Sequence, residues 1–289
     1  MTAYRAPSLF QPHRVRQALR DAHEGRIPPL ISIAISLSSI PNIRFIAPMG
    51  YDAVFLEWEH ASCSVETMTS MVHELMFMSE GKTIPFVRVP GHDHASIGWV
   101  LDAGGSVIVP QVDTVEQAKH VVSATKFGTK ARGNRSVPPF RWIPGLTDGL
   151  VDQTKTFHEN QNEQAAIVIQ VERLEALDNL DAILTEVPQI DAVMMGRLDF
   201  RTSMDLPAMT GGEEPEWLDV EARFQRITDK HNKPRVAIAL FPAARQMAVK
   251  NNTAMQIVTG DTIALAGLIN DLASAKRDIQ DYKSHEKKV

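Results

Sequence analysis

The chain has 289 residues and a formal net charge of −5, with 44% hydrophobic and 22% charged residues, which allows one large domain or two small ones and excludes a largely disordered chain. The acidic balance, without a lysine- and arginine-rich stretch, argues against a nucleic-acid partner. The lone Cys63, the lack of an apolar run approaching about 18 residues and an N-terminus without a signal-peptide core together indicate a cytoplasmic protein with no membrane partner.

Eight short runs rich in β-branched and other apolar residues recur along the chain, with helical patterns between them. They cover residues 30–36, 52–57, 84–89, 106–110, 166–171, 191–195, 235–240 and 254–259. Near-continuous apolar runs are typical of parallel strands with both faces covered. They predict an α/β fold, a (β/α)8 TIM barrel formed by a single domain over residues 1–289, with an N-terminal extension at about 1–24.

Capping residues mark several of the predicted helices. Ser64 is placed as the N-cap of a methionine-rich helix that we interpret as ordinary core packing. Thr114 and Gln117 form a capping box before another apolar pattern. A further helix begins at about Leu174 and ends before Pro188.

The last predicted helix begins at about Thr262 and has an unusually broad apolar surface. This surface includes Ile263, Leu265, Leu268, Ile269 and Leu272. It is wider than one stripe, so we expect the helix to pack on a second subunit as well as on the barrel.

Two long connections stand out between the predicted strands. They cover 128–165, before the fifth strand, and 205–217, after the sixth. Connections of this length are commonly functional, and we expect both at the C-terminal face of the barrel. If the first closed over the site as a lid, Arg132, Arg135 and Arg141 would give it positive charge.

Charged and polar residues gather where the predicted strands end, which is where a TIM barrel places its chemistry. These residues are Glu57, Glu59, His60, Arg88, Gln170, Glu172, Arg197 and Asp199. Two carboxylates from neighbouring strands, Glu172 and Asp199, suit Mg²⁺ or Mn²⁺ and leave positions open for a bidentate substrate. The alternative is that both carboxylates cap helices or lie on the surface.

Other patterns give weaker signals. The segment His92-Asp93-His94 looks like a metal site, but Asp93 is well placed as the N-cap of the helix that follows. The sequence has no G-x-S-x-G, no P-loop and no dinucleotide fingerprint, so hydrolase and Rossmann interpretations lack their motifs.

Six segments, in their order and spacing, resemble the HpcH/HpaI-type family of metal-dependent pyruvate aldolases of the phosphoenolpyruvate/pyruvate-domain superfamily. They are F-L-E-W-E-H, P-F-V-R-V-P, L-D-A-G-G-S-V-I-V-P-Q-V-D-T, G-N-R-S, I-Q-V-E and M-M-G-R-L-D. The resemblance spans roughly residues 25–275. Two segments, V-P-Q-I-D-A-V-M-M-G and F-Q-P-H-R, resemble the fungal macrophomate synthase-like branch more than other branches of the family.

The resemblance implies roles for individual residues. Glu172 and Asp199 match the two metal ligands. His60 matches the catalytic base, Asp102 the acid that orients it, and Arg88 the arginine that stabilises the enolate. The implied substrate-binding residues are Gln170, Arg88, Gly196, Arg197 and Leu198.

The implied activity is that of a class II carbon–carbon lyase, which cleaves or forms 4-hydroxy-2-oxo acids through a pyruvate enolate. The alternative is an oxaloacetate decarboxylase or a macrophomate synthase-like enolate addition enzyme; a non-catalytic barrel is a third option, against which the intact site residues argue. The expected cofactor is Mg²⁺, with Mn²⁺ or Co²⁺ as alternatives, and the expected partner is a small-molecule 2-oxo acid. The resemblance also implies a homo-oligomer, a hexamer or trimer of dimers, with an exchanged C-terminal helix.

Three departures from the family pattern bear on the substrate. Glu57 stands where the family usually has Asp, Arg197 stands where it usually has Pro, and Phe200-Arg201 stand where it usually has a small or hydroxyl residue. Arg197 adds a cation and Phe200 adds bulk beside Asp199. We interpret them as signs of a different acceptor or leaving group, with an acidic one as an option. Glu59 is interpreted as a supporting residue.

Overall fold

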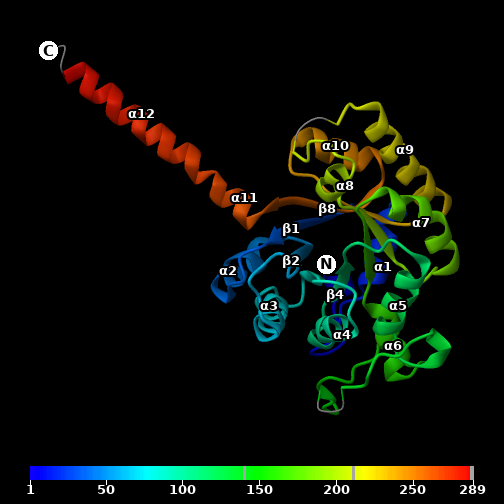
Figure 1. Cartoon of the computed structure of the whole chain (residues 1–289). Coiled ribbons are helices and arrows are strands. Elements are labelled where there is room, and N and C mark those ends of the chain that lie inside the picture. The colour runs from blue at the N-terminus through cyan, green and yellow to red at the C-terminus, as the bar shows by residue number, and fades with distance from the viewer. Residues whose placement is uncertain (139–140, 210–211, 287–289) are drawn as a thin grey trace.

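The computed structural model describes residues 1–138, 141–209 and 212–286, and it contains a closed barrel of parallel strands (Figure 1). The strands are β1 (Leu30–Ile35), β2 (Ala53–Glu57), β3 (Ile84–Arg88), β4 (Ser106–Val109), β5 (Ile167–Val171), β6 (Ala192–Met195), β7 (Arg235–Ile238) and β8 (Thr253–Gly260). Each strand pairs with the next along the chain, and β8 pairs with β1. The predicted TIM barrel is therefore confirmed.

Helices precede the first strand, connect successive strands and follow the last one. They are α1 (Val15–His23), α2 (Ile40–Ile46), α3 (Val65–Met78), α4 (His94–Ala103), α5 (Val115–Thr125), α6 (Phe157–Gln164), α7 (Leu174–Glu186), α8 (Arg197–Ser203), α9 (Pro215–Lys230), α10 (Pro242–Lys250), α11 (Asp261–Ala266) and α12 (Leu268–Glu286). The predicted N-caps are confirmed, because Ser64 and Asp93 accept hydrogen bonds from backbone amides of α3 and α4. The capping box of Thr114 and Gln117 is present at the start of α5.

Side chains along each strand point alternately into the barrel and toward the surrounding helices. In β2, Ala53 and Phe55 belong to an inner apolar cluster, whereas Val54 and Leu56 pack in the cluster that includes the helices. The inner cluster continues around the barrel with Ile84, Phe86, Ile108, Val168, Ala192, Met194 and Val236. By the same alternation, the next inward position at the end of each strand faces the mouth of the barrel.

The N-terminal extension closes the opposite end of the barrel. Val15, Ala18 and Leu19 of α1 are buried in the inner cluster, together with Leu30 at the start of β1. The extension therefore covers the N-terminal ends of the strands and leaves their C-terminal ends open.

The prediction that residues 128–165 emerge at the C-terminal face is wrong. The segment follows α5, which has already returned the chain to the N-terminal ends of the strands, and it leads into β5. It carries a short 3-10 helix, η3 (Thr129–Ala131), and α6, which packs against α1 (Figure 1). Gln11 of the N-terminal extension donates to the carbonyls of Thr147 and Gly149, at 2.8 and 3.0 Å. The segment cannot be a lid over the mouth of its own barrel; its residues 139–140 lie outside the described residues.

The segment 205–217 does lie at the C-terminal face, as predicted, because it follows β6 and α8. Residues 210–211 of this segment lie outside the described residues.

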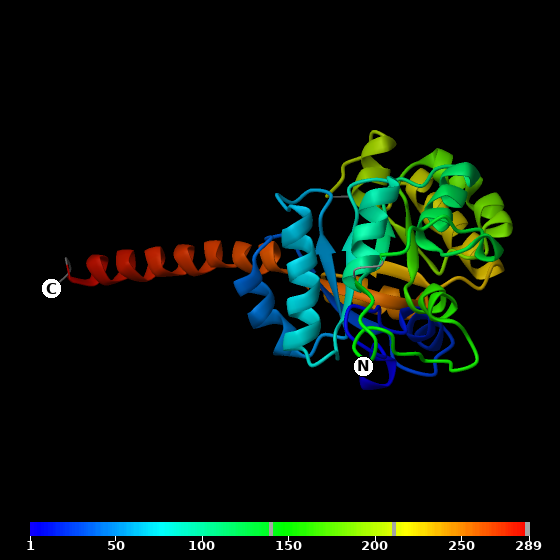
Figure 2. The same ribbon diagram turned by 90° about the horizontal axis from the view of Figure 1, so that it is seen from below.

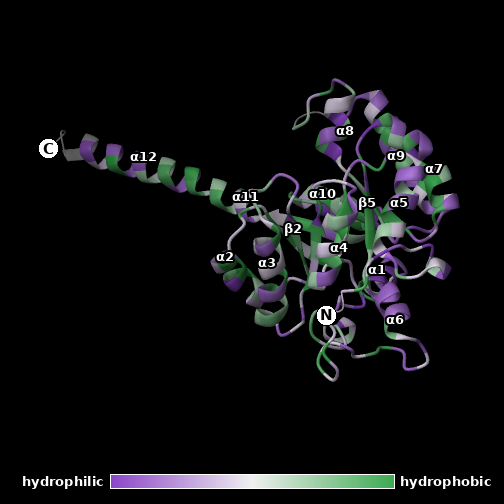
Figure 3. Ribbon diagram, turned by 60° about the horizontal axis from the view of Figure 1, so that its bottom comes forward, coloured by the Kyte–Doolittle hydropathy of each residue, from purple (hydrophilic) through white to green (hydrophobic). Residues whose placement is uncertain are grey.

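The last helix projects away from the barrel (Figures 1 and 2). Apolar bands recur along α12 (Figure 3), and its exposed apolar side chains are Leu268, Ile269, Leu272, Ile279 and Tyr282. Ile31, which faces outward on β1, is 38% exposed, although outward strand positions in a TIM barrel are normally covered by a helix. The last helix of the chain therefore leaves part of its own barrel wall bare.

Candidate active site

Polar side chains replace apolar ones where the inward-facing series of several strands reaches the barrel mouth. Ala53 and Phe55 lead to Glu57, Ile84 and Phe86 lead to Arg88, and Val168 leads to Gln170 and then Glu172. Strand alternation therefore brings together four residues that the sequence placed in the site: Glu57, Arg88, Gln170 and Glu172.

Glu57 and Arg88 are neighbours across β2 and β3 and form an ion pair. Arg88 donates from Nε to Glu57 Oε1 at 3.2 Å and from Nη2 to Oε2. Glu57 Oε1 also accepts the backbone amides of Glu59 and His60, at 2.8 and 3.1 Å. One buried carboxylate thus holds both the arginine and the turn that carries His60.

Glu59 lies between Arg88 and His60. Its Oε2 is 3.2 Å from Arg88 Nε and 3.6 Å from His60 Nε2. The His60 side chain is 65% exposed, so its ring is open to a substrate at the mouth. Sequence reasoning did not anticipate that Glu59 would lie close to both Arg88 and His60.

Glu172 is buried and held from three directions. Its Oε2 accepts the backbone amide of Gln111 at 2.9 Å, and its Oε1 accepts Gln170 Nε2 at 3.0 Å. A Cβ atom on Gly196 would lie 2.2 Å from Glu172 Oε1, so any larger residue there would displace the Glu172 carboxylate. The contact with Gln111, which has a positive φ of 50°, was not foreseen; its position at the end of the fourth predicted strand was the only signal.

Negative charge accumulates at this mouth. The pKa of Glu172 is raised to about 7, mainly by burial and in addition by the charges of Asp199 and Glu59, while the Gln111 amide and Arg88 oppose the rise. Burial also raises the pKa of Glu59, where Arg88 opposes the effect and Asp199 adds to it. These carboxylates are close enough to repel one another, which favours a bound cation.

The predicted residues 197–199 form the first turn of α8, beside Glu172. Asp199 and Leu198 are exposed. The Arg197 guanidinium forms an ion pair with Glu221 of α9 and lies 4.8 Å from the centre of the Trp217 ring. Arg197 is therefore engaged by α9 in this structure.

The interpretation of Phe200 as added bulk beside Asp199 is wrong. Phe200 is fully buried and packs edge-on against Trp217, with ring centres 5.7 Å apart. Consecutive residues on a helix point about 100° apart, so Phe200 faces the core while Asp199 faces the mouth. Arg201 is buried as well and forms an ion pair with Glu214.

Asp102 is the one predicted catalytic residue that the structure does not bring to the mouth. It lies near the end of α4, at the N-terminal face, where it accepts a hydrogen bond from Arg135 Nη2 at 2.7 Å. The expectation that Asp102 orients His60 therefore fails within a single chain, because a helix returns the chain to the opposite end of the barrel.

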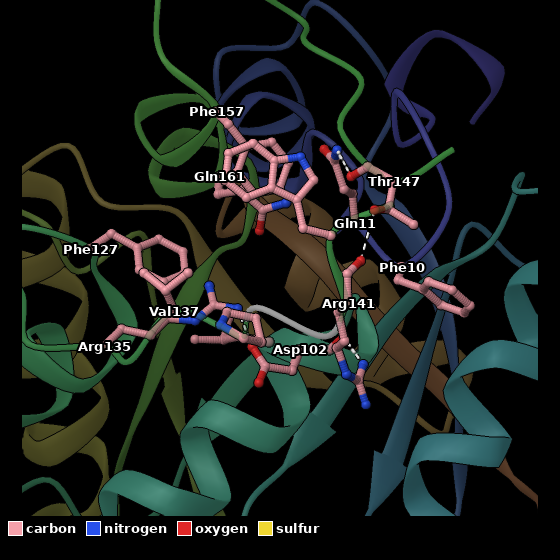
Figure 4. A pocket seen from close by; sticks show the side chains of 13 residues that line it. Phe10, Gln11, Asp102, Phe127, Arg135, Val137, Arg141, Thr147, Phe157 and Gln161 are labelled. Carbon is pink, nitrogen blue, oxygen red and sulfur yellow. Dashed lines mark hydrogen bonds and ion pairs between the residues drawn. The ribbon is translucent and has the colours of Figure 1, made fainter. Parts of the chain in front are cut away.

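A small cavity lies beside Asp102 (Figure 4). Its lining includes Asp102, Arg135, Arg141, Trp142 and Phe157, and its volume is about 30 Å³. The cavity lies at the N-terminal face of the barrel, away from the mouth, so it is not the candidate site. Arg135 and Arg141 lie at this N-terminal end of the barrel and not in a lid over the mouth.

Among the described residues, no group of three or more His, Cys, Asp or Glu side chains is arranged to hold a metal ion. Nor does any helix in the described ranges have the length and apolarity to cross a membrane.

A TIM barrel with carboxylates, an arginine and a histidine at its C-terminal mouth defines an enzyme-type barrel. The chain belongs to the HpcH/HpaI aldolase/citrate lyase family, whose model matches residues 36–265. The predictions of this family and of a class II aldolase or lyase are thereby confirmed; such enzymes are generally divalent-metal dependent.

Individual relatives agree with this assignment. A 2-keto-3-deoxy-L-rhamnonate aldolase of Salmonella schwarzengrund (strain CVM19633) is 30% identical over 258 residues, which are 88% of this chain and 91% of the relative. A crystal structure of macrophomate synthase has a TM-score of 0.90 at 26% identity and covers 98% of this chain and 95% of its own. An HpcH/HpaI family protein of Burkholderia cenocepacia J2315, with a TM-score of 0.76 at 22% identity and coverages of 93% and 98%, shares the fold.

Proposed function

We propose that this protein is a divalent-metal-dependent lyase that cleaves or forms 4-hydroxy-2-oxo acids, with pyruvate and an aldehyde as the other reactants. The observation that carries the proposal is the buried Glu172 carboxylate, which rests against Gly196 next to Asp199 and Gln170. The 30% identity to a 2-keto-3-deoxy-L-rhamnonate aldolase supports the same class of substrate.

Glu172 and Asp199 would hold the metal, and Mg²⁺ suits two carboxylates best. Three observations fit a cation there: the mutual repulsion of the carboxylates, the glycine that makes room for Glu172, and the buried Gln170 Oε1, which has no hydrogen-bond partner among the described residues. A bound divalent cation would supply positive charge that stabilises the negative charge developing on a 2-oxo acid when the bond at C3 breaks.

Arg88 would bind the keto oxygen of the substrate and stabilise the enolate. Two of its nitrogens, Nε and Nη2, are used by Glu57 and Glu59. These contacts fix the plane of the guanidinium and direct the remaining nitrogen, Nη1, to a substrate oxygen.

His60 would take the proton from the C4 hydroxyl during retro-aldol cleavage, directly or through a water. Its ring is exposed at the mouth, and Glu57 fixes its backbone. Glu59 is the carboxylate of the same chain nearest to its Nε2. Because Asp102 lies at the other end of its own barrel, we propose that it orients His60 of another copy of the chain.

A second candidate function is decarboxylation of oxaloacetate, or an enolate addition of the macrophomate synthase kind. The TM-score of 0.90 with macrophomate synthase favours it. Loss of CO₂ generates the same enolate and would use the same metal pair and Arg88. It needs no base at a C4 hydroxyl.

Pyruvate release from oxaloacetate and from a 4-hydroxy-2-oxo acid, each with Mg²⁺, Mn²⁺ or Co²⁺, would choose between the two functions. We expect both activities, with His60→Ala reducing aldol cleavage far more than decarboxylation. Decarboxylation without any aldehyde exchange would contradict the aldolase proposal, and equal losses in His60→Ala would contradict the role of His60.

We further propose a homo-oligomer, a hexamer or trimer of dimers, in which α12 of one protomer covers the bare barrel wall of another. The exposed apolar side chains of α12 and the exposed Ile31 support this exchange. We place the protein in the cytoplasm, since its single cysteine, Cys63, is free.

A further inference from the structure

Arg201 carries a buried charge that the proposed reaction does not use. It lies in the last turn of α8, two residues after Asp199, and is 1% exposed. Removing a guanidinium from water is costly unless its donors are satisfied. The surroundings of Arg201 must therefore provide specific partners.

The segment that follows α8 supplies several such partners. Arg201 donates to both oxygens of Glu214, at 3.0 and 2.9 Å, and from Nε to the Pro207 carbonyl at 2.8 Å. Its guanidinium lies 5.1 Å from the centre of the Trp217 ring. A bidentate pair of this kind fixes orientation as well as distance.

The rest of the same helix face binds the same neighbour. Arg197, Phe200 and Arg201 share one face of α8, at i, i+3 and i+4 spacing. All three contact Trp217 at the start of α9. Asp199 lies on the opposite face, toward Glu172.

A helix of seven residues has little stability of its own. The direction of Asp199 therefore depends on how α8 is anchored, and the Arg201–Glu214 pair is the buried, two-pronged part of that anchor. Because residues that support metal ligands tune affinity, we propose that Arg201 and Glu214 are positioning residues that set the affinity of the Glu172–Asp199 site for a divalent cation. The inference rests on the proposed function.

The test is a direct measurement of Mn²⁺ binding by the full-length protein, with free Mn²⁺ followed by electron paramagnetic resonance. We expect Arg201→Met and Glu214→Gln each to raise the dissociation constant by about 10- to 100-fold. The double variant should bind no more weakly than the weaker single one, since both changes break one contact. In turnover, the Mn²⁺ concentration for half-maximal rate should rise while the rate at saturating Mn²⁺ changes little.

Arg223→Met is the matched control, because Arg223 of α9 forms a partly exposed ion pair with Asp178. The Mn²⁺ affinity of this variant should stay within about twofold of the wild-type value. If Arg201→Met does not fold, Glu214→Gln, which keeps the shape of the side chain, carries the test. Folded variants that bind Mn²⁺ as tightly as the wild type would overturn the inference. A wild-type protein that binds no Mn²⁺ would instead overturn the proposed function.

Discussion

Glu172 links the packing of the barrel to its chemistry. It follows the inward-facing Val168 and Gln170, so its burial is a consequence of strand alternation. Burial and the neighbouring carboxylates raise its pKa to about 7. A cation would relieve this repulsion, and the same carboxylate must lose its proton to bind one.

Glu172 should make the stability of the metal-free protein depend on pH. Because the pKa of Glu172 rises from an ordinary value of 4.5 to about 7 on folding, the stabilisation associated with its protonated form is complete below pH 4.5 and is lost as the pH rises through about 7. In EDTA, the melting temperature of the wild type should fall over this window relative to that of Glu172→Gln, which cannot titrate. Parallel curves for the two proteins would contradict the assignment.

The site residues differed in how far the sequence could place them. Glu57, Arg88, Gln170 and Glu172 follow from alternation along strands, a local rule that the sequence displays. The position of Asp102 relative to His60 depends on which barrel end each helix terminus reaches, and Phe200 depends on the rotation of α8 about its axis. The resemblance in sequence motifs does not reveal the barrel end at which Asp102 lies or the direction in which Phe200 points.

At the scale of elements, the strands and the capped helices could be predicted because each leaves a local periodic or capping signal. The position of the long segment before β5 could not be predicted in this way, because the barrel face at which it emerges depends on whether a complete helix precedes it. Once α5 is counted, the segment must lie at the N-terminal end. There, Asn162 of α6 exchanges two hydrogen bonds with the backbone of Phe127, at 2.8 and 2.9 Å, and its carbonyl accepts Lys126 Nζ at 2.6 Å.

Asn162→Ala should therefore destabilise the protein by ~1–3 kcal/mol, because it leaves the buried backbone groups of Phe127 without partners. Gln153→Ala, at an exposed position of the same segment, should change stability by less than ~0.5 kcal/mol. Urea unfolding of both variants measures the difference. Equal midpoints would show that α6 does not anchor the segment.

At the scale of the whole molecule, two features are incomplete in one chain. The helix α12 has an apolar surface and no barrel beneath it (Figure 2), and Asp102 lies far from the site in which the family resemblance places it. Assembly of several copies would resolve both.

Replacing apolar residues of α12 should dissociate this assembly. We expect Leu272→Glu with Ile279→Glu to reduce the oligomer to smaller species, because charges would enter the exchanged interface. Light scattering after size-exclusion chromatography measures the mass. Lys276→Glu, at a charged position of the same helix, serves as the control, and an unchanged mass in the double variant would contradict the exchange.

The assignment of Asp102 to another copy predicts complementation between inactive variants. His60→Ala and Asp102→Asn proteins should each lose most aldol cleavage, and mixed oligomers made by co-expression should recover part of it. Recovery is expected because some sites would combine an intact His60 with an intact Asp102 from a neighbour. No recovery in verified mixed oligomers would show that Asp102 does not act across copies.

The central claim is that a divalent metal held by Glu172 and Asp199 drives a pyruvate lyase reaction at the barrel mouth. The most direct measurement is pyruvate release from a 4-hydroxy-2-oxo acid, coupled to a reporter, with added Mg²⁺ or Mn²⁺ and with excess EDTA. We predict release only with metal, and a loss of about 100-fold or more in Glu172→Ala. Release that continues unchanged in EDTA, or that survives in Glu172→Ala, would contradict the account.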